Sequence, residues 1–383
     1  TLRLQRVLLK FTCGFEGELT TIKYLYVDRL ANPKLKWEKT TSWNVGLDLG
    51  FFDGRITSTI DYYKMNTTDM IMGQKLPRMT GFDSVTTNLG EVTNDGLEIS
   101  INTQNIKKKN FQWNSSFSFT WNKNRIKHLY YEYDENGKEI NDIDNRWFIG
   151  KPINEIWMFK TIGTWQADEW QEAAKYAQQP GDPKVEDVNN DGIYNDDDRQ
   201  FLGQTTHPIH VQLRNEFVIK KNWTLAFNVY GNFGGKQISN YFMNNFNDGG
   251  QVDFGLMTPR SGTYWTIENP TNDFLRIGAS VPKGVPALYQ VYNASHIRFE
   301  NLSAAYNIPS KSLKKLGIEK ARVFVTVKNL GLVKFCKTWE YGDIETYFSN
   351  RKGGRSFAGS DQAGSGYYGG SNRTYTFGVS LTL

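Results

Sequence analysis

Strict alternation of apolar and polar residues over long stretches is the feature of this sequence that most limits its possible folds. Between residues 111 and 121, aromatic side chains occupy alternate positions, namely Phe111, Trp113, Phe117, Phe119 and Trp121. The intervening positions carry asparagine, glutamine, serine and threonine. Successive side chains of a β-strand point to opposite faces, so this period of two predicts a strand with one apolar and one polar face.

The same alternation recurs along the chain and predicts a series of long strands. We expect them near residues 41–50, 54–65, 95–104, 111–122, 210–220, 222–233, 293–307, 321–330 and 371–383, with 19–27 as a further candidate. A strand that crosses a bilayer at a tilt needs about 9–11 residues, which these stretches provide. Their polar faces are rich in Asn, Ser, Thr, Gln and Lys, as expected of a water-facing barrel wall.

These patterns favour an all-β fold, an antiparallel transmembrane β-barrel with long extracellular loops. Predicted turns are short at 52–54, 105–110 and 220–222, whereas the remaining connections are long: 66–94, 123–209, 234–292 and 331–370. Short turns at one end and long loops at the other are typical of outer-membrane barrels. The strand-like segment 157–165 then belongs to a long loop. The alternative is a soluble β-sandwich, in which a second sheet would cover the apolar faces.

The number of predicted strands indicates that the chain does not close a barrel alone. The stretches above without 19–27 are odd in number, whereas single-chain bacterial barrels close with an even number of strands. An open edge in lipid would leave main-chain groups unpaired, which is costly. We therefore expect this chain to supply the last part of a larger barrel.

Composition excludes several other classes of protein. The 45 Lys and Arg residues exceed the 40 Asp and Glu residues by only five, and the longest basic run, Lys107–Lys109, lies in a predicted turn. Nucleic-acid binding is therefore not expected. No apolar run approaches the ~20 residues of a membrane helix. Two cysteines, Cys13 and Cys336, do not make a disulfide framework, and whether they pair stays open.

The sequence contains no credible catalytic motif. Its four histidines are His128, His207, His210 and His296, and the one close pair flanks a proline without the helical spacing of a zinc site. There is no G-x-S-x-G motif and no phosphate-binding glycine loop. We therefore expect that the protein is not an enzyme.

A calcium-binding loop is the sharpest local motif. Oxygen ligands occur at loop positions 1, 3, 5, 9 and 12, and a main-chain carbonyl would serve at position 7; the residues are Asp187, Asn189, Asp191, Ile193, Asn195 and Asp198. This is the spacing of the 12-residue Ca²⁺ loop, with Gly192 at the sharp turn, although Asp198 replaces the usual Glu. The alternative is a solvated acidic loop.

Tryptophans are frequent in the predicted long loops: Trp147, Trp157, Trp165, Trp170, Trp265 and Trp339. Flat amphipathic rings can stack on sugars, so these side chains are candidates to face a substrate or a lid protein. Packing within the loops is the alternative. Two further residues, Trp121 and Trp223, are predicted at strand ends, where aromatic girdles mark the membrane interface.

Several segments, in order, resemble the SusC/RagA family of TonB-dependent outer-membrane transporters. They are NPKLKWEKTT (32–41), FDGRITSTIDYY (52–63), NLGEVTNDGLE (88–98), DVNNDGIYNDDDRQFLG (187–203), WTIENP (265–270), ASHIRFENLSAAYNIP (294–309), ARVFVTVKNL (321–330) and RTYTFGVSLTL (373–383). The resemblance divides the chain into an unassigned segment, 1–31, and a C-terminal barrel portion, 32–383.

The resemblance implies a barrel of about 22 strands in the outer membrane of a Gram-negative bacterium. It implies import of a glycan or an oligopeptide, with a SusD-like surface lipoprotein as lid. Energy would come from the TonB complex through a plug domain and a TonB box, which have no match in this chain. Alternative functions are those of a secreted, calcium-stabilised carbohydrate-binding β-sandwich or a passive porin.

The last strand also resembles the C-terminal signal that barrel assembly machinery recognises. Aromatic and aliphatic side chains alternate to the final position, as Tyr375, Phe377, Val379, Leu381 and Leu383. Leu383 stands where a phenylalanine is usual. An ordinary terminal strand is the compatible alternative.

Overall fold

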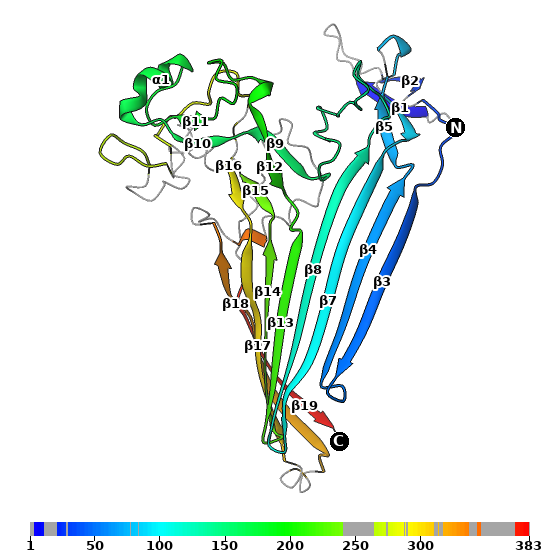
Figure 1. The fold of residues 1–383 in the computed structure, drawn as a ribbon, viewed down its shortest axis with the longest axis vertical. Helices are drawn as coiled ribbons and strands as arrows, with labels where there is room; N and C mark the ends of the chain where they lie inside the picture. The colour runs from blue at the N-terminus through cyan, green and yellow to red at the C-terminus, as the bar shows by residue number, and fades with distance from the viewer. Residues whose placement is uncertain are drawn as a thin grey trace. The chain divides into compact units, whose positions relative to one another are not determined.

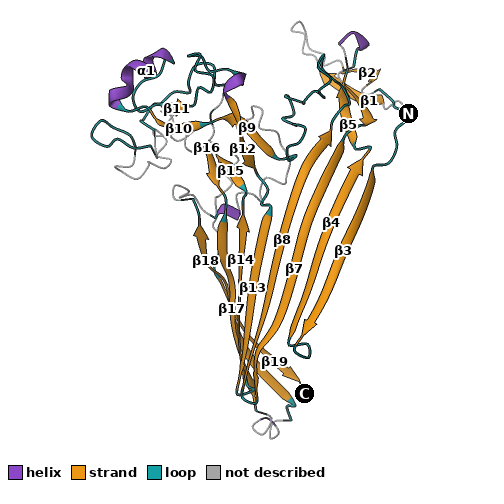
Figure 2. Cartoon of the chain, viewed as in Figure 1, coloured by secondary structure: helices purple, strands orange, loops and turns teal. Residues whose placement is uncertain are grey.

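The computed structural model describes residues 4–10, 21–27, 30–76, 78–82, 84–239, 264–272, 275–286, 288, 290–309, 313, 317–336, 343–345 and 372–382. Cys13, Trp339 and Leu383, on which parts of the predictions rest, lie outside these residues. Strands make up nearly all of the regular structure, and the helices are few and short (Figure 2).

Nine strands form one large antiparallel sheet. They are β3 (Lys39–Phe51), β4 (Ile56–Thr68), β7 (Glu91–Lys108), β8 (Phe111–His128), β13 (Ile209–Ile219), β14 (Trp223–Phe233), β17 (His296–Ile308), β18 (Lys320–Lys334) and β19 (Thr374–Thr382). Their order in the sheet, from β19 to β3, is the reverse of their order in the chain (Figure 1). This meander confirms the nine predicted spans, several of which extend further than the sequence pattern indicated.

The large sheet has two open edges in the described structure. β3 is hydrogen-bonded only to β4, and β19 only to β18. The sheet therefore does not close on itself within the described residues. This agrees with the argument that an odd number of spans needs further strands to complete a barrel.

Shorter strands form separate two-stranded sheets. The pairs are β1 (Leu4–Lys10) with β2 (Thr21–Val27), β5 (Ile71–Lys75) with β6 (Ser84–Asn88), β9 (Glu155–Phe159) with β12 (Arg199–Gln204), β10 (Thr161–Thr164) with β11 (Pro183–Val185), and β15 (Lys236–Ser239) with β16 (Gln290–Asn293). The predicted extra-sheet position of 157–165 is confirmed. The candidate strand at 19–27 exists as β2, but it pairs with β1 and adds no span.

The register of the sheet separates its two faces as predicted. Phe117 lies opposite Leu213, which in turn lies opposite Val229, so apolar side chains share one face across β8, β13 and β14. Apolar side chains of this face are well exposed, with 40% exposure for Leu213 and 78% for Phe377. A second sheet would bury them, so the β-sandwich alternative is wrong.

Contacts divide the chain into two compact units. The first comprises Thr1–Val45, Tyr63–Asp95 and Lys123–Ile153, and its buried core contains Val92, Ile126 and Leu129. The second comprises Gly46–Tyr62, Gly96–Asn122 and Asn154–Leu383. Within it, the long connections fold around their own apolar core of Phe159, Val185, Tyr194, Leu275, Ala279, Val285 and Leu288. Among the described helices, none has the length and apolar character to cross a membrane.

Candidate functional site

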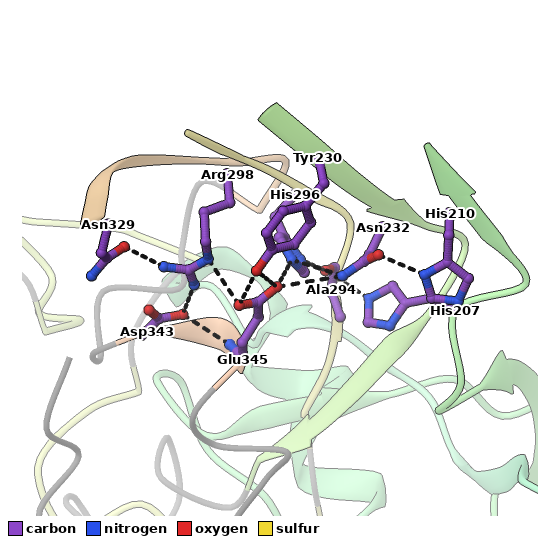
Figure 3. Close-up of polar contacts among 10 residues, drawn as sticks. All are labelled: His207, His210, Tyr230, Asn232, Ala294, His296, Arg298, Asn329, Asp343 and Glu345. Carbon is purple, nitrogen blue, oxygen red and sulfur yellow. Dashed lines mark hydrogen bonds and ion pairs between the residues drawn. The ribbon is translucent and has the colours of Figure 1, made fainter. Parts of the chain in front are cut away.

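A buried polar network lies on the polar face of the large sheet, where β14, β17 and β18 approach their long connections (Figure 3). Strand alternation explains its position: Tyr230 and Asn232 on β14, and His296 and Arg298 on β17, occupy the phase opposite to the apolar side chains. Two carboxylates, Asp343 and Glu345, join them from the connection between β18 and β19. Residues far apart in the chain thus converge on one part of the polar wall.

Glu345 is the centre of the network. Its carboxylate accepts hydrogen bonds from Nε2 of His296 at 2.6 Å and from the hydroxyl of Tyr230 at 2.8 and 2.9 Å. Nε of Arg298 lies 2.8 Å from the same carboxylate. Burial raises the pKa of Glu345, but the hydrogen bonds from His296 and Tyr230 and the charge of Arg298 outweigh it and lower the pKa below its ordinary value. Glu345 is therefore ionised at neutral pH.

Arg298 links both carboxylates to the sheet. Its side chain is only 5% exposed, and the guanidinium donates to Oδ1 of Asp343 and, at 2.5 Å, to Oδ1 of Asn329 on β18. The main-chain N–H of Glu345 donates to Asp343 at 3.0 Å. A planar guanidinium suits this task because it can contact several acceptors in fixed directions.

His296 is buried and held at both ring nitrogens. It is 1% exposed, with Nδ1 2.9 Å from the main-chain oxygen of Ala294 and Nε2 beside Glu345. The amide nitrogen of Asn232 also lies 3.3 Å from Nε2. His207 differs: burial lowers its pKa, and its Nε2 contacts the Ala294 oxygen at 3.0 Å.

An apolar contact reinforces the ionic ones. Ile344, between the two carboxylates, is 1% exposed and packs with Tyr292 and Ala294, with Leu332 and Cys336 beside it. The first and last residues of the segment 343–345 are therefore held by ion pairs, and the middle residue, Ile344, is held by apolar packing. The arrangement fixes a loop segment to the water-facing wall. It has the character of a structural clamp.

The predicted calcium ligands share one loop, which follows β11 and ends in a short 3-10 helix, Asp196–Asp198. Asp187 accepts hydrogen bonds from the N–H of Gly192 at 2.9 Å and from the hydroxyl of Tyr176 at 2.9 Å. The fully buried Asp198 accepts from the N–H groups of Val188 and Asn195. Among the described residues, no three His, Cys, Asp or Glu side chains are grouped as a metal site. Calcium binding stays a prediction.

The loop tryptophans differ widely in exposure. Trp165 and Trp265 are 4% and 7% exposed, and the indole N–H of Trp265 donates to Gln166 at 3.0 Å. Trp157 is half-buried beneath the guanidinium of Arg199, and Trp147 packs on the core of the first unit. Trp170, in helix α1 (Trp170–Lys175), is 57% exposed. Of these tryptophans, Trp170 has the exposure that contact with a substrate or lid requires, and that role stays a prediction.

The strand-end predictions have mixed outcomes. β19 contains Tyr375, Phe377, Val379 and Leu381, all exposed on one face, and their role as an assembly signal stays a prediction. Trp223 begins β14, as expected of a girdle residue. β8 continues to His128, so the expected position of Trp121 at a strand end is wrong. Its alternating pattern weakens after Trp121, although main-chain pairing continues.

Sequence reasoning did not find the buried network. Tyr230, Asn232 and Arg298 are unremarkable polar residues on the expected polar faces, and Asp343 and Glu345 belong to a long connection without a motif. The strand alternation did contain one useful signal. His296 and Arg298 are two residues apart on one strand, so both side chains point to the predicted water-facing side. Their partners could not be inferred, because the loop conformation brings them together.

An open nine-stranded sheet with one exposed apolar face and one hydrogen-bonded polar face defines the wall of a membrane β-barrel. A family model described as "TonB dependent receptor-like, beta-barrel" matches residues 18–231. The chain belongs to this family of outer-membrane β-barrels, which places it in the outer membrane of a Gram-negative bacterium.

Individual relatives support the same family. The chain is 32% identical to TonB-dependent receptor P26 of Formosa agariphila, over 80% of this chain and 31% of that protein. It is 28% identical to TonB-dependent receptor SusC of Bacteroides thetaiotaomicron, over 78% and 29%. The solved structure of the RagAB peptide transporter has a similar fold, with a TM-score of 0.65, 22% identity and coverage of 87% and 35%. The chain thus spans about a third of the length of these relatives.

Proposed function

We propose that this chain forms part of the barrel of a SusC-like TonB-dependent transporter, which imports a nutrient across the outer membrane. The observation that carries the proposal is the contrast between the two faces of the sheet. Apolar side chains suited to lipid stand on one face. The other face carries a fixed polar network suited to a water-filled chamber.

The nutrient is a glycan or an oligopeptide, both of which are polar and too large for simple diffusion. A SusD-like lipoprotein would cover the long loops, and the TonB complex would act on a plug through a TonB box in the full-length protein. The chamber would work by gated binding and release, with no bond made or broken. The family membership and the likeness to SusC support this assignment.

Uptake by cells tests the proposal. Cells that produce the full-length protein containing this chain are given fluorescent oligosaccharide or oligopeptide pools, with and without a functional TonB complex. We expect uptake of one pool, and its loss without TonB. Uptake that persists without TonB would instead support the passive porin.

We also propose that residues 187–198 bind Ca²⁺ and so rigidify an extracellular loop. The ligand spacing supports this proposal, and so does the ionised state of Asp187. Burial raises the pKa of Asp187, but the hydrogen bonds from Gly192 and Tyr176 have the larger effect, so the pKa lies below its ordinary value. Calcium titration by calorimetry, with a chelator control, measures the binding. Asp187→Asn with Asp191→Asn should abolish it. Asp134→Asn, in another acidic turn, should not. Absence of heat with the unaltered protein would refute the claim.

A further inference from the structure

The apolar face of the sheet has a hollow of ≈ 720 Å³ near the short-turn end of β14, β17, β18 and β19. Two cross-strand rows surround it. The row nearer the turns contains Trp223, Tyr306, Val323 and Val379, and the next contains Ala304, Val325 and Phe377; Ala305, Phe324 and Gly378, which lie between these rows in the strands, complete the lining. Ala304 creates the hollow, because its methyl group stands in a row of large side chains.

The walls of the hollow combine aliphatic and aromatic surface. The rings of Trp223 and Tyr306 pack with their centroids 4.6 Å apart at the edge nearest the turns. Amphipathic rings favour the depth at which lipid headgroups begin. Val323, in the same row, and Phe377, in the next row, are 44% and 78% exposed. The shape and chemistry suit a hydrocarbon chain that enters from the membrane.

Two lysines lie in the turn that leads into Trp223, a residue that lines this hollow. Lys220 and Lys221 form the turn that precedes Trp223, with φ angles of 49° and 64°. The hydrogen-bonded turn Ile219–Asn222, within a three-residue connection, has both central residues in this left-handed conformation, which favours Asn and Gly because a longer side chain is strained there. Both lysines are exposed, and neither forms an ion pair within the described part of the chain. The turn conformation therefore does not itself require lysine at either position.

The whole short-turn end carries excess positive charge. In the described segments 52–55, 107–110, 220–222 and 317–320 there are seven Lys or Arg residues and two acidic residues. The net charge of the entire chain is only +5. The charge excess is thus concentrated at the end of the sheet that adjoins the hollow, where it would meet anionic headgroups.

We propose that the hollow and the Lys220–Lys221 turn bind one anionic phospholipid from the membrane leaflet on the short-turn side. An acyl chain would fill the space above Ala304, and the phosphate would contact the two ammonium groups. A soluble anion would not fill the apolar hollow, and a neutral lipid would not form ion pairs with the lysines. The site does not depend on which nutrient the protein imports.

Native mass spectrometry of retained lipid tests the proposal. The full-length protein in detergent is mixed with phosphatidylglycerol or phosphatidylcholine of the same acyl chains. We expect preferential retention of phosphatidylglycerol. Lys220→Asn with Lys221→Gly removes the charge but suits the turn, and Ala304→Leu fills the hollow. The turn variant should lower phosphatidylglycerol retention by about tenfold or more, and Ala304→Leu should also lower it.

Matched controls separate lipid binding from folding. Lys138→Gln removes a lysine from a turn in a long connection and should leave retention unchanged. Heat-modifiable gel mobility should be the same for all variants, since none alters the polar network. Equal retention of the two lipids by the unaltered protein would overturn the proposal. So would unaltered phosphatidylglycerol retention in both the turn variant and the Ala304→Leu variant.

Discussion

At the scale of single residues, burial decides which polar contacts matter. Arg298 and Arg214 both stand on β-strands beside carboxylates, but their side chains are 5% and 59% exposed. When a buried charge loses its partner, neither water nor the protein replaces the lost interaction, so the protein is strongly destabilised. An exposed charge is solvated by water, so the loss of its partner changes stability little. The two arginines therefore make a matched pair for experiment.

Arg298→Ala should release residues 343–345 from the sheet, because it removes the guanidinium that contacts both Asp343 and Glu345. We expect a loss of about 3–5 kcal/mol in the stability of this anchoring. Hydrogen exchange at the amides of residues 343–345 measures it. Arg214→Ala should change stability by less than about 1 kcal/mol. Equal exchange in both variants would contradict the anchoring role.

Acid should also weaken the anchoring of residues 343–345 to the sheet. The pKa of Glu345 is lower in the folded protein than in the unfolded chain. Its contribution to stability is therefore complete above the unfolded pKa, about 4.3, and is lost as pH falls through the folded pKa. The protection of the amides of residues 343–345, relative to their intrinsic exchange rates at each pH, should fall below about pH 4.3. Glu345→Gln should remove most of this pH dependence; an unchanged profile in that variant would assign the effect to another group.

At the scale of secondary-structure elements, side-chain contacts reinforce strand pairing. Asn215 on β13 is 5% exposed and accepts from Nε1 of Trp113 at 2.8 Å and from Oγ of Ser115 at 2.6 Å, both on β8. These polar groups stand on the otherwise apolar face. They satisfy one another across the strands, which is how a lipid-facing surface tolerates them.

Asn215→Ala should therefore destabilise the β8–β13 pairing, since it leaves the Trp113 and Ser115 donors unpaired. The expected cost is about 1–3 kcal/mol, measured as a lower unfolding midpoint by heat-modifiable mobility. Ser116→Ala, which removes an exposed hydrogen bond to Asn102 on the opposite face, is the control and should have little effect. A similar midpoint for both variants would argue against a cross-strand role for Asn215.

At the scale of the whole molecule, the two unpaired edge strands dominate the behaviour of the chain. β3 and β19 each present a row of main-chain donors and acceptors without a neighbour on one side in the described structure. Such edges pair readily with other chains. A membrane makes the pairing stronger, because lipid supplies no hydrogen bonds.

The 383-residue chain refolded alone in detergent should consequently form a mixture of oligomers. Light scattering after size-exclusion chromatography measures this, with the full-length protein as the reference. We expect several species from the isolated chain and a defined assembly from the full-length protein. A single monomeric species with heat-modifiable mobility would mean that nine strands can close, contrary to the parity argument.

The sequence by itself determined the strands and their two faces, because both follow from the local alternation of apolar and polar residues. It also determined that the sheet is incomplete, because the number of predicted spans is odd. Stretches such as 111–121 and 323–327 carry that pattern in consecutive residues. The tertiary structure alone decided the partners of Arg298 and His296 and the burial of Trp165 and Trp265. Those contacts depend on how long connections return to the wall, and no short-range pattern encodes where a loop folds back.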